Sequence, residues 1–323
     1  MIVGSSGDIP RTIEDLIAPG TLQRLDRLDL VSRKVFPGRL PGERRSKKRG
    51  RSVEFEDYRA YVPGDDLRHI DWNVFARLDR LFIKIYLEEE DLGLHLILDA
   101  SPSMRAGEPD KFVFCQRLAM ALGYLGLVAN NRVSMSVFGD GGLRRLGECR
   151  GRRSVQRLGQ FILGLPYADG ADGQAPRSAP RAETFTEAMR LVAASRAGKG
   201  VVVVLSDFLF HEGYDAGLRY LAGGRNWDVS CLQTLAPDEI EPEKAGGGTI
   251  TGDLRLTDVE TGADAEVTVT AALLAQYKHR LEHYCSNLAA FCAARDMTHL
   301  LVRTDTQIET LLLDDLRQRG MLR

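Results

Sequence analysis

The sequence predicts an α/β fold with a doubly wound, mostly parallel sheet, and two observations support that prediction. After Gly93, short apolar runs alternate with longer segments of helical periodicity, which is typical of strand–helix–strand crossover units. The run Val201–Leu205 is continuously apolar, as expected for a central strand covered on both faces. A chain of 323 residues is also long enough for two domains. We therefore expect the sheet domain over residues 93–323 and a smaller α+β extension over residues 1–92.

Each strand of the sheet is expected where apolar residues form a short cluster between polar or glycine-containing segments. The expected strands are Leu94–Leu98, Val133–Phe138, Val201–Leu205, Val229–Leu235 and His299–Val302. Between these strands, apolar residues recur at the spacing of one helix face. The expected helices span about Lys111–Val128, Ser154–Leu163, Thr184–Ser195, Tyr214–Ala222, Ala271–Arg295 and Thr306–Arg319.

The N-terminal extension and two insertions complete the expected architecture. Apolar residues recur at helical spacing between Thr12 and Val35 with a break at Pro19-Gly20, which predicts two short amphipathic helices. The segment Leu81–Tyr86 predicts a strand. Residues Pro166–Arg181 are rich in Gly, Ala, Pro and Asp, which predicts an exposed, mobile loop. Alternating apolar residues within about 246–270, around the turn Glu260-Thr261-Gly262, predict an inserted β-hairpin.

The composition gives the chain no overall attraction to polyanions. It has 43 Lys and Arg against 45 Asp and Glu, so only a local patch such as Arg44–Arg51 could bind anions. The five scattered cysteines form no CxxC pair, which argues against a disulfide framework or a zinc site and fits a reducing compartment. No run of about 18 apolar residues occurs, and the N-terminus lacks a cationic start followed by an apolar stretch. We expect a cytoplasmic protein without a membrane span.

Oxygen-bearing side chains follow two of the expected strands. Asp99, Ser101 and Ser103 follow the first strand, and Asp207 follows the third. Ligands of open α/β sheets collect beyond the carboxyl ends of the strands, so these four residues are candidates for a binding site. Carboxylates and hydroxyls suit a hard divalent cation, Mg²⁺ or Mn²⁺. Alternatively, Asp99 caps the following turn and the serines are ordinary loop residues.

These residues resemble the metal-ion-dependent adhesion site of the von Willebrand factor A superfamily. Its pattern is Asp-x-Ser-x-Ser, then a Thr from a second loop and an Asp from a third, and Asp99, Ser101, Ser103 and Asp207 match the first and last parts. The resemblance implies a Rossmann-type fold and an ion that accepts a carboxylate from a partner. Because few protein charges surround such an ion, it stays electrophilic.

The position of the threonine ligand has two interpretations. The family's second loop usually reads Thr-x-hydrophobic-x-x-Ala-hydrophobic, and Phe185, Ala188 and Met189 fit its later positions. That alignment places Glu183 where the threonine belongs, with Thr184 one residue away. Either Thr184 is a ligand, or Glu183 replaces it and holds the ion more tightly and in a less electrophilic state. Thr184 completes the expected metal set of Asp99, Ser101, Ser103, Thr184 and Asp207.

A longer resemblance covers nearly the whole chain. The polar segment Gly50–Trp72, followed by Ala76-Arg77, is similar to the signature of the bacterial domain-of-unknown-function family number 58. Residues Gly252–Gly262 also match that family's pattern. Its members are typically found beside MoxR-type AAA+ ATPases and have a presumed adaptor role in the assembly or maturation of other proteins. The resemblance therefore implies a non-catalytic adaptor whose partners are such an ATPase and its client.

The polar segment also allows a different function. Between Asp65 and Asp71, acids and an arginine crowd around His69, which could act as the general base of a metal-dependent hydrolase. The patch Arg44–Arg51 could bind nucleic acid, although it lacks interleaved aromatic residues. No nucleophile–histidine spacing or phosphate loop accompanies the segment, and its alternation of acids with arginines favours internal pairing. We expect no enzymatic activity, and a protein partner rather than a nucleic acid or a small molecule.

Overall fold

The structure is a computed structural model in which two compact units are distinguished. It describes residues 9–26, 28, 55–63, 65, 67–86, 92–139, 142–165, 184–195, 199–223, 226–243, 252–257 and 264–322. The larger unit comprises Met1–Lys34 with Leu92–Arg323, and the smaller unit comprises Val35–Asp91. The expected division at residue 92 differs from these units, because it grouped the first helices with the polar segment.

The larger unit is built on a six-stranded, mostly parallel sheet with the strand order β10-β7-β6-β3-β4-β5. The strands are β3 (Gly93–Ala100), β4 (Arg132–Gly139), β5 (Arg144–Arg150), β6 (Gly200–Ser206), β7 (Trp227–Leu235) and β10 (Thr298–Arg303). All neighbours pair in parallel except β5, which pairs antiparallel with β4. The five expected strands are present, and the predicted α/β class with a mostly parallel sheet is confirmed.

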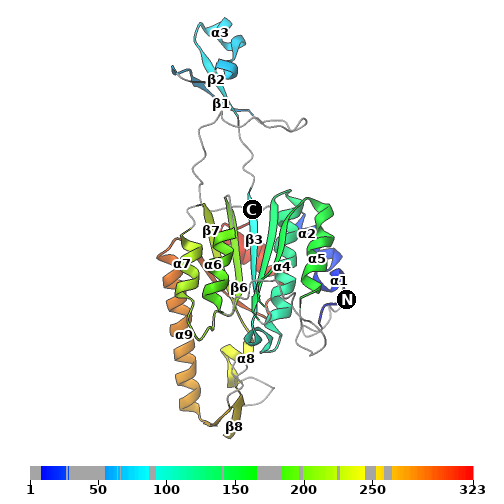
Figure 1. Ribbon diagram of the computed structural model, residues 1–323, viewed down its shortest axis with the longest axis vertical. Coiled ribbons are helices and arrows are strands. Elements are labelled where there is room, and N and C mark those ends of the chain that lie inside the picture. The colour runs from blue at the N-terminus through cyan, green and yellow to red at the C-terminus, as the bar shows by residue number, and fades with distance from the viewer. Residues whose placement is uncertain are drawn as a thin grey trace. The chain divides into compact units, whose positions relative to one another are not determined.

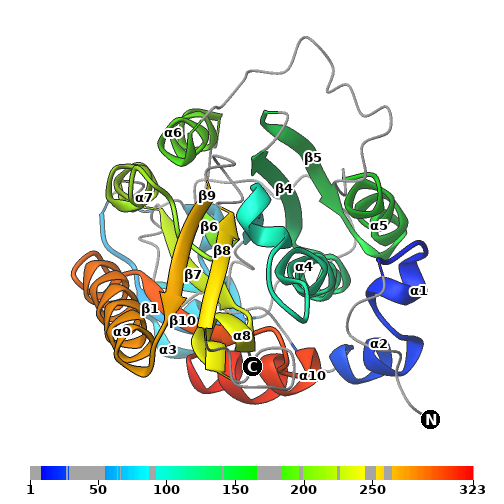
Figure 2. The same cartoon turned by 90° about the horizontal axis from the view of Figure 1, so that it is seen from below.

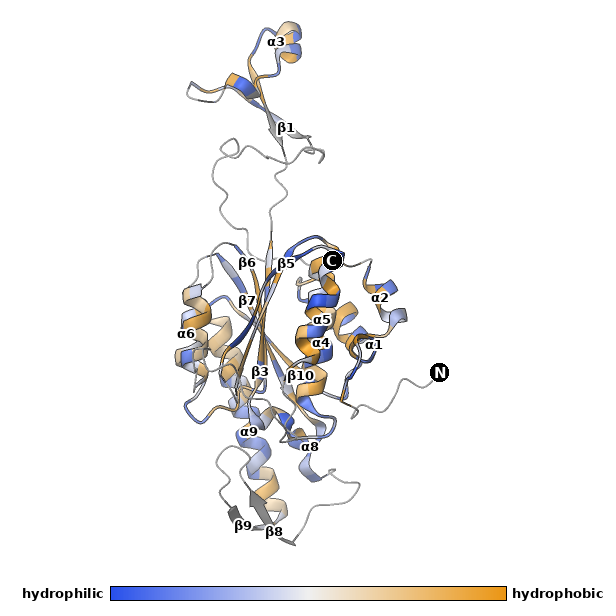
Figure 3. Cartoon of the chain, turned by 45° about the vertical axis from the view of Figure 1, so that its right-hand side comes forward, coloured by the Kyte–Doolittle hydropathy of each residue, from blue (hydrophilic) through white to orange (hydrophobic). Residues whose placement is uncertain are grey.

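Helices cover both faces of this sheet, as the view from below shows (Figure 2). The helices of the larger unit are α1 (Ile13–Leu16), α2 (Pro19–Leu25), α4 (Lys111–Val128), α5 (Val155–Leu163), α6 (Phe185–Ser195), α7 (Asp215–Ala222), α8 (Pro237–Ile240), α9 (Ala271–Ala293) and α10 (Ile308–Thr310), followed by a π-helical turn (Leu311–Leu316). One core cluster joins the sheet to α4, α5 and the N-terminal helices, and a second joins it to α6, α7 and α9. Hydropathy colouring places the apolar residues at these interfaces (Figure 3).

Helix α4 lies at the centre of the first core. Its N-cap Asp110 accepts a hydrogen bond from Val113 N at 2.8 Å, and nearly every residue of the helix is buried. Glycines at two positions let it approach its neighbours, because a Cβ on Gly126 would lie 2.7 Å from Val133 Cγ2 and one on Gly123 would lie 2.3 Å from Leu158 Cδ2. Among the described residues, α4 alone is long and apolar enough to cross a membrane, and 89% of it is buried inside the unit. Such extensive burial of α4 is typical of the core helix of a folded domain.

The two N-terminal helices pack on the sheet domain. Thr12 begins α1 with a capping box in which Asp15 bonds back to Thr12 N, and Pro19 is the first residue of α2. Leu16 and Leu25 are buried in the same core cluster as α4. The predicted pair of short helices is therefore present. The sequence shows that each helix has an apolar face, but not which core that face joins.

The smaller unit is a two-stranded antiparallel sheet with a short helix. It contains β1 (Phe55–Ala60), a 3₁₀ turn (Leu67–His69), α3 (Trp72–Leu78) and β2 (Phe82–Tyr86). The expected strand Leu81–Tyr86 corresponds to β2, whereas helix α3 was not expected from the polar signature. Asp71 begins α3 by accepting hydrogen bonds from the backbone N–H groups of Asn73 and Val74 at 2.9 and 3.2 Å.

A hairpin and a long helix extend from the larger unit beyond the sheet (Figure 1). The predicted hairpin is present as β8 (Gly252–Thr257) and β9 (Asp264–Val269), while its expected turn Glu260-Thr261-Gly262 lies outside the described residues. Helix α9 follows directly, and only Leu288 and Cys292 of its side chains are fully buried. The expected loop Pro166–Arg181 and the basic patch Arg44–Arg51 also lie outside the described residues.

One further difference from the predicted elements has a physical reason. Strand β5 was not expected because three arginines, a glycine and a glutamate separate and flank its two buried residues, Leu146 and Cys149, so it contains no continuous apolar run. Such charges are common on edge strands, where they discourage pairing with another chain. The predicted helix Thr306–Arg319 is present over residues 308–318, where α10 continues into the π-helical turn and Leu311, Leu312 and Leu316 are buried.

Candidate functional site

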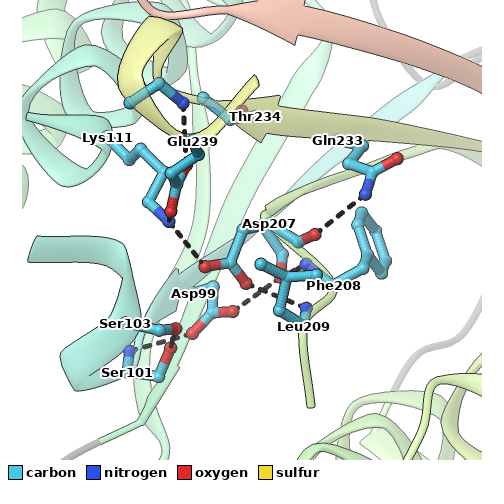
Figure 4. A network of polar contacts seen from close by, with 12 residues as sticks. Asp99, Ser101, Ser103, Lys111, Asp207, Phe208, Leu209, Gln233, Thr234 and Glu239 are labelled. Carbon is cyan, nitrogen blue, oxygen red and sulfur yellow. Dashed lines mark hydrogen bonds and ion pairs between the residues drawn. The ribbon is translucent and has the colours of Figure 1, made fainter. Parts of the chain in front are cut away.

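The candidate site lies where the central strands β3 and β6 end. These strands are parallel neighbours with Leu98 paired to Leu205. The residues that follow them therefore meet at the edge of the sheet formed by the carboxyl ends of the parallel strands. The hydroxyl of Ser206 donates a hydrogen bond of 2.6 Å to Asp99 Oδ2. Figure 4 shows the carboxylates of Asp99 and Asp207 lying next to each other. The structure thus brings together the two acids that the sequence placed on separate strands.

Asp99 is an acid held in the protein interior. Its side chain is fully buried, and its Oδ1 atom accepts a hydrogen bond of 2.9 Å from Ser101 N. Burial, together with the negative charge of Asp207, raises the pKa of Asp99 to about 7. Because burial and the charge of Asp207 both disfavour the ionised form of Asp99, a cation bound beside this carboxylate would stabilise that form.

Ser101 and Ser103 place two hydroxyl groups beside Asp99. Their Oγ atoms are 3.0 Å apart, and Ser103 lies in a 3₁₀ turn (Pro102–Arg105) that begins after Ser101. Close approach of Gly139 fixes this loop from the neighbouring strand. Gly139 has a φ of +130°, and a Cβ there would lie 2.5 Å from Ala100 C and 2.6 Å from Ser101 N. The sequence therefore needs glycine at this position for the loop to sit where it does.

Asp207 is held by both of its oxygens. Oδ1 accepts a hydrogen bond of 3.0 Å from Leu209 N, and Oδ2 is 2.9 Å from the ammonium of Lys111. The next residue, Phe208, has a φ of 59° and is fully buried, a left-handed conformation that is rare for a bulky residue. It turns the chain so that Phe208 N donates 2.9 Å to Ser206 Oγ. Strain at this turn is thus part of how Asp207 is positioned.

Thr184 lies at the start of α6 and is exposed. Its Oγ1 accepts a hydrogen bond of 3.2 Å from Glu187 N, which caps the helix. The adjacent Phe185 stacks on Phe210 with ring centroids 4.3 Å apart and meets Phe208 edge-on, so α6 begins beside the Asp207 loop. In the described part of the chain, no hydrogen bond joins Thr184 to the other four expected ligands. Glu183, the alternative ligand, lies outside the described residues.

Three residues of the site, two of them buried and one partly buried, were not among the sequence candidates. They are Ser206, Lys111 and Glu239, and Lys111 pairs with both Asp207 and Glu239 (Figure 4). The carboxylates of Asp207 and Glu239 outweigh the effect of burial and raise the pKa of Lys111. One signal in the sequence pointed to Lys111, since a lysine at the first position of an apolar helix opposes the helix dipole. Glu239 gave a weaker signal as an acid that follows the end of β7.

The residues of the site fit a hard divalent cation. Two carboxylates and two hydroxyls offer oxygen donors of the kind that Mg²⁺ and Mn²⁺ prefer. Within the described ranges, no three His, Cys, Asp or Glu side chains gather in an arrangement that could hold a metal. A cation at this edge of the sheet would therefore depend on the serine hydroxyls as well as on Asp99 and Asp207.

The polar segment of the smaller unit uses its acids for local structure. Asp71 caps α3 and also accepts a hydrogen bond of 3.0 Å from Tyr58 Oη. Asp65 pairs with Arg59 at 2.8 Å and accepts a hydrogen bond from Val62 N. Bonds from Val62 and Arg59 lower the pKa of Asp65. The side chain of His69 lies outside the described residues. The described acids of this segment therefore act as caps and turn partners.

Comparisons with known proteins find similar sequences and similar solved structures, all at low sequence identity. The chain is 24% identical over 294 residues to uncharacterized proteins of Mycobacterium tuberculosis and Mycobacterium bovis, an alignment that covers 90% of this chain and 87% of each relative. Its structure is similar to that of the conserved hypothetical protein BatB from Bacteroides thetaiotaomicron, with a TM-score of 0.39 and 16% identity over 71% of this chain and 98% of that one. An aerotolerance-related membrane protein from Bacteroides fragilis gives a TM-score of 0.36 and 16% identity over 70% and 97%.

The sequence profile of one protein family matches most of the chain. That family is described as "Protein of unknown function DUF58", and its profile matches residues 57–284. The matched region begins in β1 and ends within α9, so it includes the Asp99 and Asp207 loops and the polar segment of the smaller unit. More than half of the chain is covered. The protein therefore belongs to the DUF58 family.

Proposed function

We propose that this protein is a non-catalytic, protein-binding adaptor with a von Willebrand factor A-like domain. Its site would hold Mg²⁺ or Mn²⁺, and the cation would bind an acidic group of a protein partner. The observation that carries the proposal is the meeting of two buried acids, Asp99 and Asp207, with the hydroxyls of Ser101 and Ser103 at neighbouring strand ends. A donor set of this composition favours a hard, oxygen-seeking ion.

The gradient of burial across the site supports binding of a partner. Asp99 and Asp207 are fully buried, Ser101 is 9% exposed, and Thr184 is exposed. The acids would anchor the cation, and the hydroxyls of Ser101 and Ser103 would bind it without neutralising its charge. Thr184 would complete the set, because its oxygen keeps a lone pair after capping α6. A carboxylate approaching from the hydroxyl side would meet an ion that is still electrophilic.

The described acids of the polar segment support a non-catalytic role. Asp71 and Asp65 are engaged in a helix cap, a tyrosine contact and a salt bridge. A metal-dependent hydrolase built on the segment Asp65–Asp71 would need these carboxylates free to hold a metal or move a proton. That hydrolase, or nucleic-acid binding through residues 44–51, is the outcome to look for if the adaptor proposal fails.

Binding to a purified AAA+ ATPase tests the proposal. The family resemblance suggests a MoxR-type ATPase from the same organism, together with its client, as the partners. We expect retention of the ATPase on the immobilised chain in Mg²⁺, and loss of retention in EDTA and in Asp99→Asn. The matched control is Asp314→Ala, an exposed acid outside the site, which should bind like the wild-type chain. Equal retention with EDTA and with Asp99→Asn would overturn the metal-dependent adaptor.

A further inference from the structure

Lys111 is a cation placed where both burial and the helix dipole oppose it. Its side chain is 1% exposed, and it is the first residue of α4, where the helix end carries partial positive charge. Burying an unpaired ammonium would be strongly unfavourable. The lysine is therefore held by its partners, Asp207 Oδ2 at 2.9 Å and Glu239 Oε1 on its other side.

Hydrogen bonds from two other residues hold Glu239 in place beside Lys111. Its second oxygen, Oε2, accepts a hydrogen bond of 2.8 Å from Ala236 N, and its backbone carbonyl accepts one of 2.7 Å from Tyr277 Oη in α9. Burial raises the pKa of Glu239 even though Lys111 opposes the shift. These hydrogen bonds hold the carboxylate of Glu239 beside the ammonium of Lys111.

The cluster has a net charge that matches a divalent cation. Asp99, Asp207 and Glu239 contribute three negative charges when ionised, and Lys111 contributes one positive charge, which leaves a net charge of −2. In a poorly solvated site, charges a few ångströms apart interact strongly. One added or removed charge near Asp207 should therefore change the affinity for a cation more than a small movement of a ligand would.

We propose that Lys111 and Glu239 form a charge pair that sets the cation affinity of the Asp99–Asp207 site while making no contact with the cation. Lys111 is a positioning residue, because it acts through Asp207. It offsets part of the negative charge, which keeps the site folded without a cation and limits how tightly a cation binds. Glu239 has the opposite effect. This inference rests on the proposed metal site.

The test is a calorimetric titration of the full chain with Mn²⁺ for three variants. Lys111→Met removes the positive charge and should tighten Mn²⁺ binding about tenfold or more, whereas Glu239→Gln removes a negative charge and should weaken it about tenfold. Glu243→Gln is the matched control, because Glu243, which follows α8, pairs with Lys278 of α9 and with no residue of the Asp99–Asp207 site among the described contacts. It should bind Mn²⁺ as the wild-type chain does.

The opposite changes in Mn²⁺ affinity expected for Lys111→Met and Glu239→Gln separate a charge effect from a merely structural role. If Lys111 only supported the fold, both variants at the pair would loosen the site and weaken Mn²⁺ binding. Weaker binding in Lys111→Met, or unchanged binding in Glu239→Gln, overturns the inference alone. If Lys111→Met does not fold, as judged by circular dichroism, Lys111→Gln replaces it, because glutamine also removes the positive charge but keeps a polar end; tighter Mn²⁺ binding remains the expected result, and weaker binding overturns the inference. Absence of Mn²⁺ binding to the wild-type chain overturns the proposed function, and this inference with it.

Discussion

Gly139→Ala should distort the loop that carries the serines of the site. Gly139 has a φ of +130°, and the added Cβ would lie 2.5, 2.6 and 2.7 Å from Ala100 C, Ser101 N and Ala100 O. These are backbone atoms of the neighbouring strand end, so no side chain can rotate to relieve the contact. The Asp99–Ser103 loop has to move, or the β4 backbone has to change its conformation.

The expected cost of Gly139→Ala is about 2–4 kcal/mol of unfolding free energy. A left-handed backbone contributes roughly 1–3 kcal/mol for a residue with a side chain, and the backbone overlap adds to it. For a unit of this size, that loss should lower the Tm by roughly 5–15 °C. Urea unfolding followed by circular dichroism measures the loss, and a Mn²⁺ titration of the folded variant measures the damage to the site.

The matched control for this variant is Gly147→Ala. A Cβ on Gly147, in β5, meets nothing within 4 Å, and its φ is not in the left-handed region. Its substitution should change the unfolding free energy by no more than about 0.5 kcal/mol. If Gly139→Ala unfolds at the same urea concentration as Gly147→Ala and binds Mn²⁺ as well, the reasoning about this close approach is refuted.

Three further predictions follow from the described contacts. Ser206→Ala removes the donor to Asp99 Oδ2 and the acceptor for Phe208 N, and should lower the free energy of unfolding in urea by about 1–3 kcal/mol. Ser195→Ala, which removes the hydrogen bond to Val192 O, is the control and should give a smaller loss. Burial lowers the pKa of His299 to about 4, so the unfolded chain binds a proton that the folded chain does not. The contribution of His299 to the free energy of unfolding should be complete above pH 6.5 and should fall by about 1–2 kcal/mol as the pH drops towards 4. This value is reduced because the side chain is partly exposed. The same part of the pH dependence should be missing in His299→Asn. Asp71→Ala removes the N-cap of α3 and the hydrogen bond from Tyr58. It should speed hydrogen exchange of the backbone amides in α3 by about tenfold. Equal exchange rates in the variant and the wild-type chain would contradict the structural role of Asp71.

The strands and the acids of the site were predictable because their signals are local. Val201–Leu205 is a continuous apolar run, and Asp99 and Asp207 each follow such a run directly in the sequence. The parallel pairing that brings the two acids together follows from the alternation of strands and helices. Strand β5 was missed because its arginines interrupt any apolar run, and its place at the edge is a property of the whole sheet.

The contact between Lys111 and Glu239 was not predictable, for a different reason. Lys111 and Glu239 are 128 positions apart in the sequence, and neither lies in a recognisable motif. Their contact depends on α4 and α8 meeting at the same sheet edge. The docking of α1 and α2 is similar, because an amphipathic pattern shows that a face is buried but not what it is buried against. Contacts between residues that are far apart in the sequence and meet only through tertiary packing can be identified from the structure but not from the sequence.

Diffraction from crystals grown with Mn²⁺ and measured at the manganese absorption edge tests the central claim most directly. The account predicts an anomalous peak bonded to the hydroxyl oxygens of Ser101 and Ser103 and adjacent to the carboxylates of Asp99 and Asp207. The same map would show whether Thr184 or Glu183 reaches the ion. A map with no anomalous peak at this edge of the sheet, from a chain whose Asp99 and Asp207 loops are ordered, would contradict the claim.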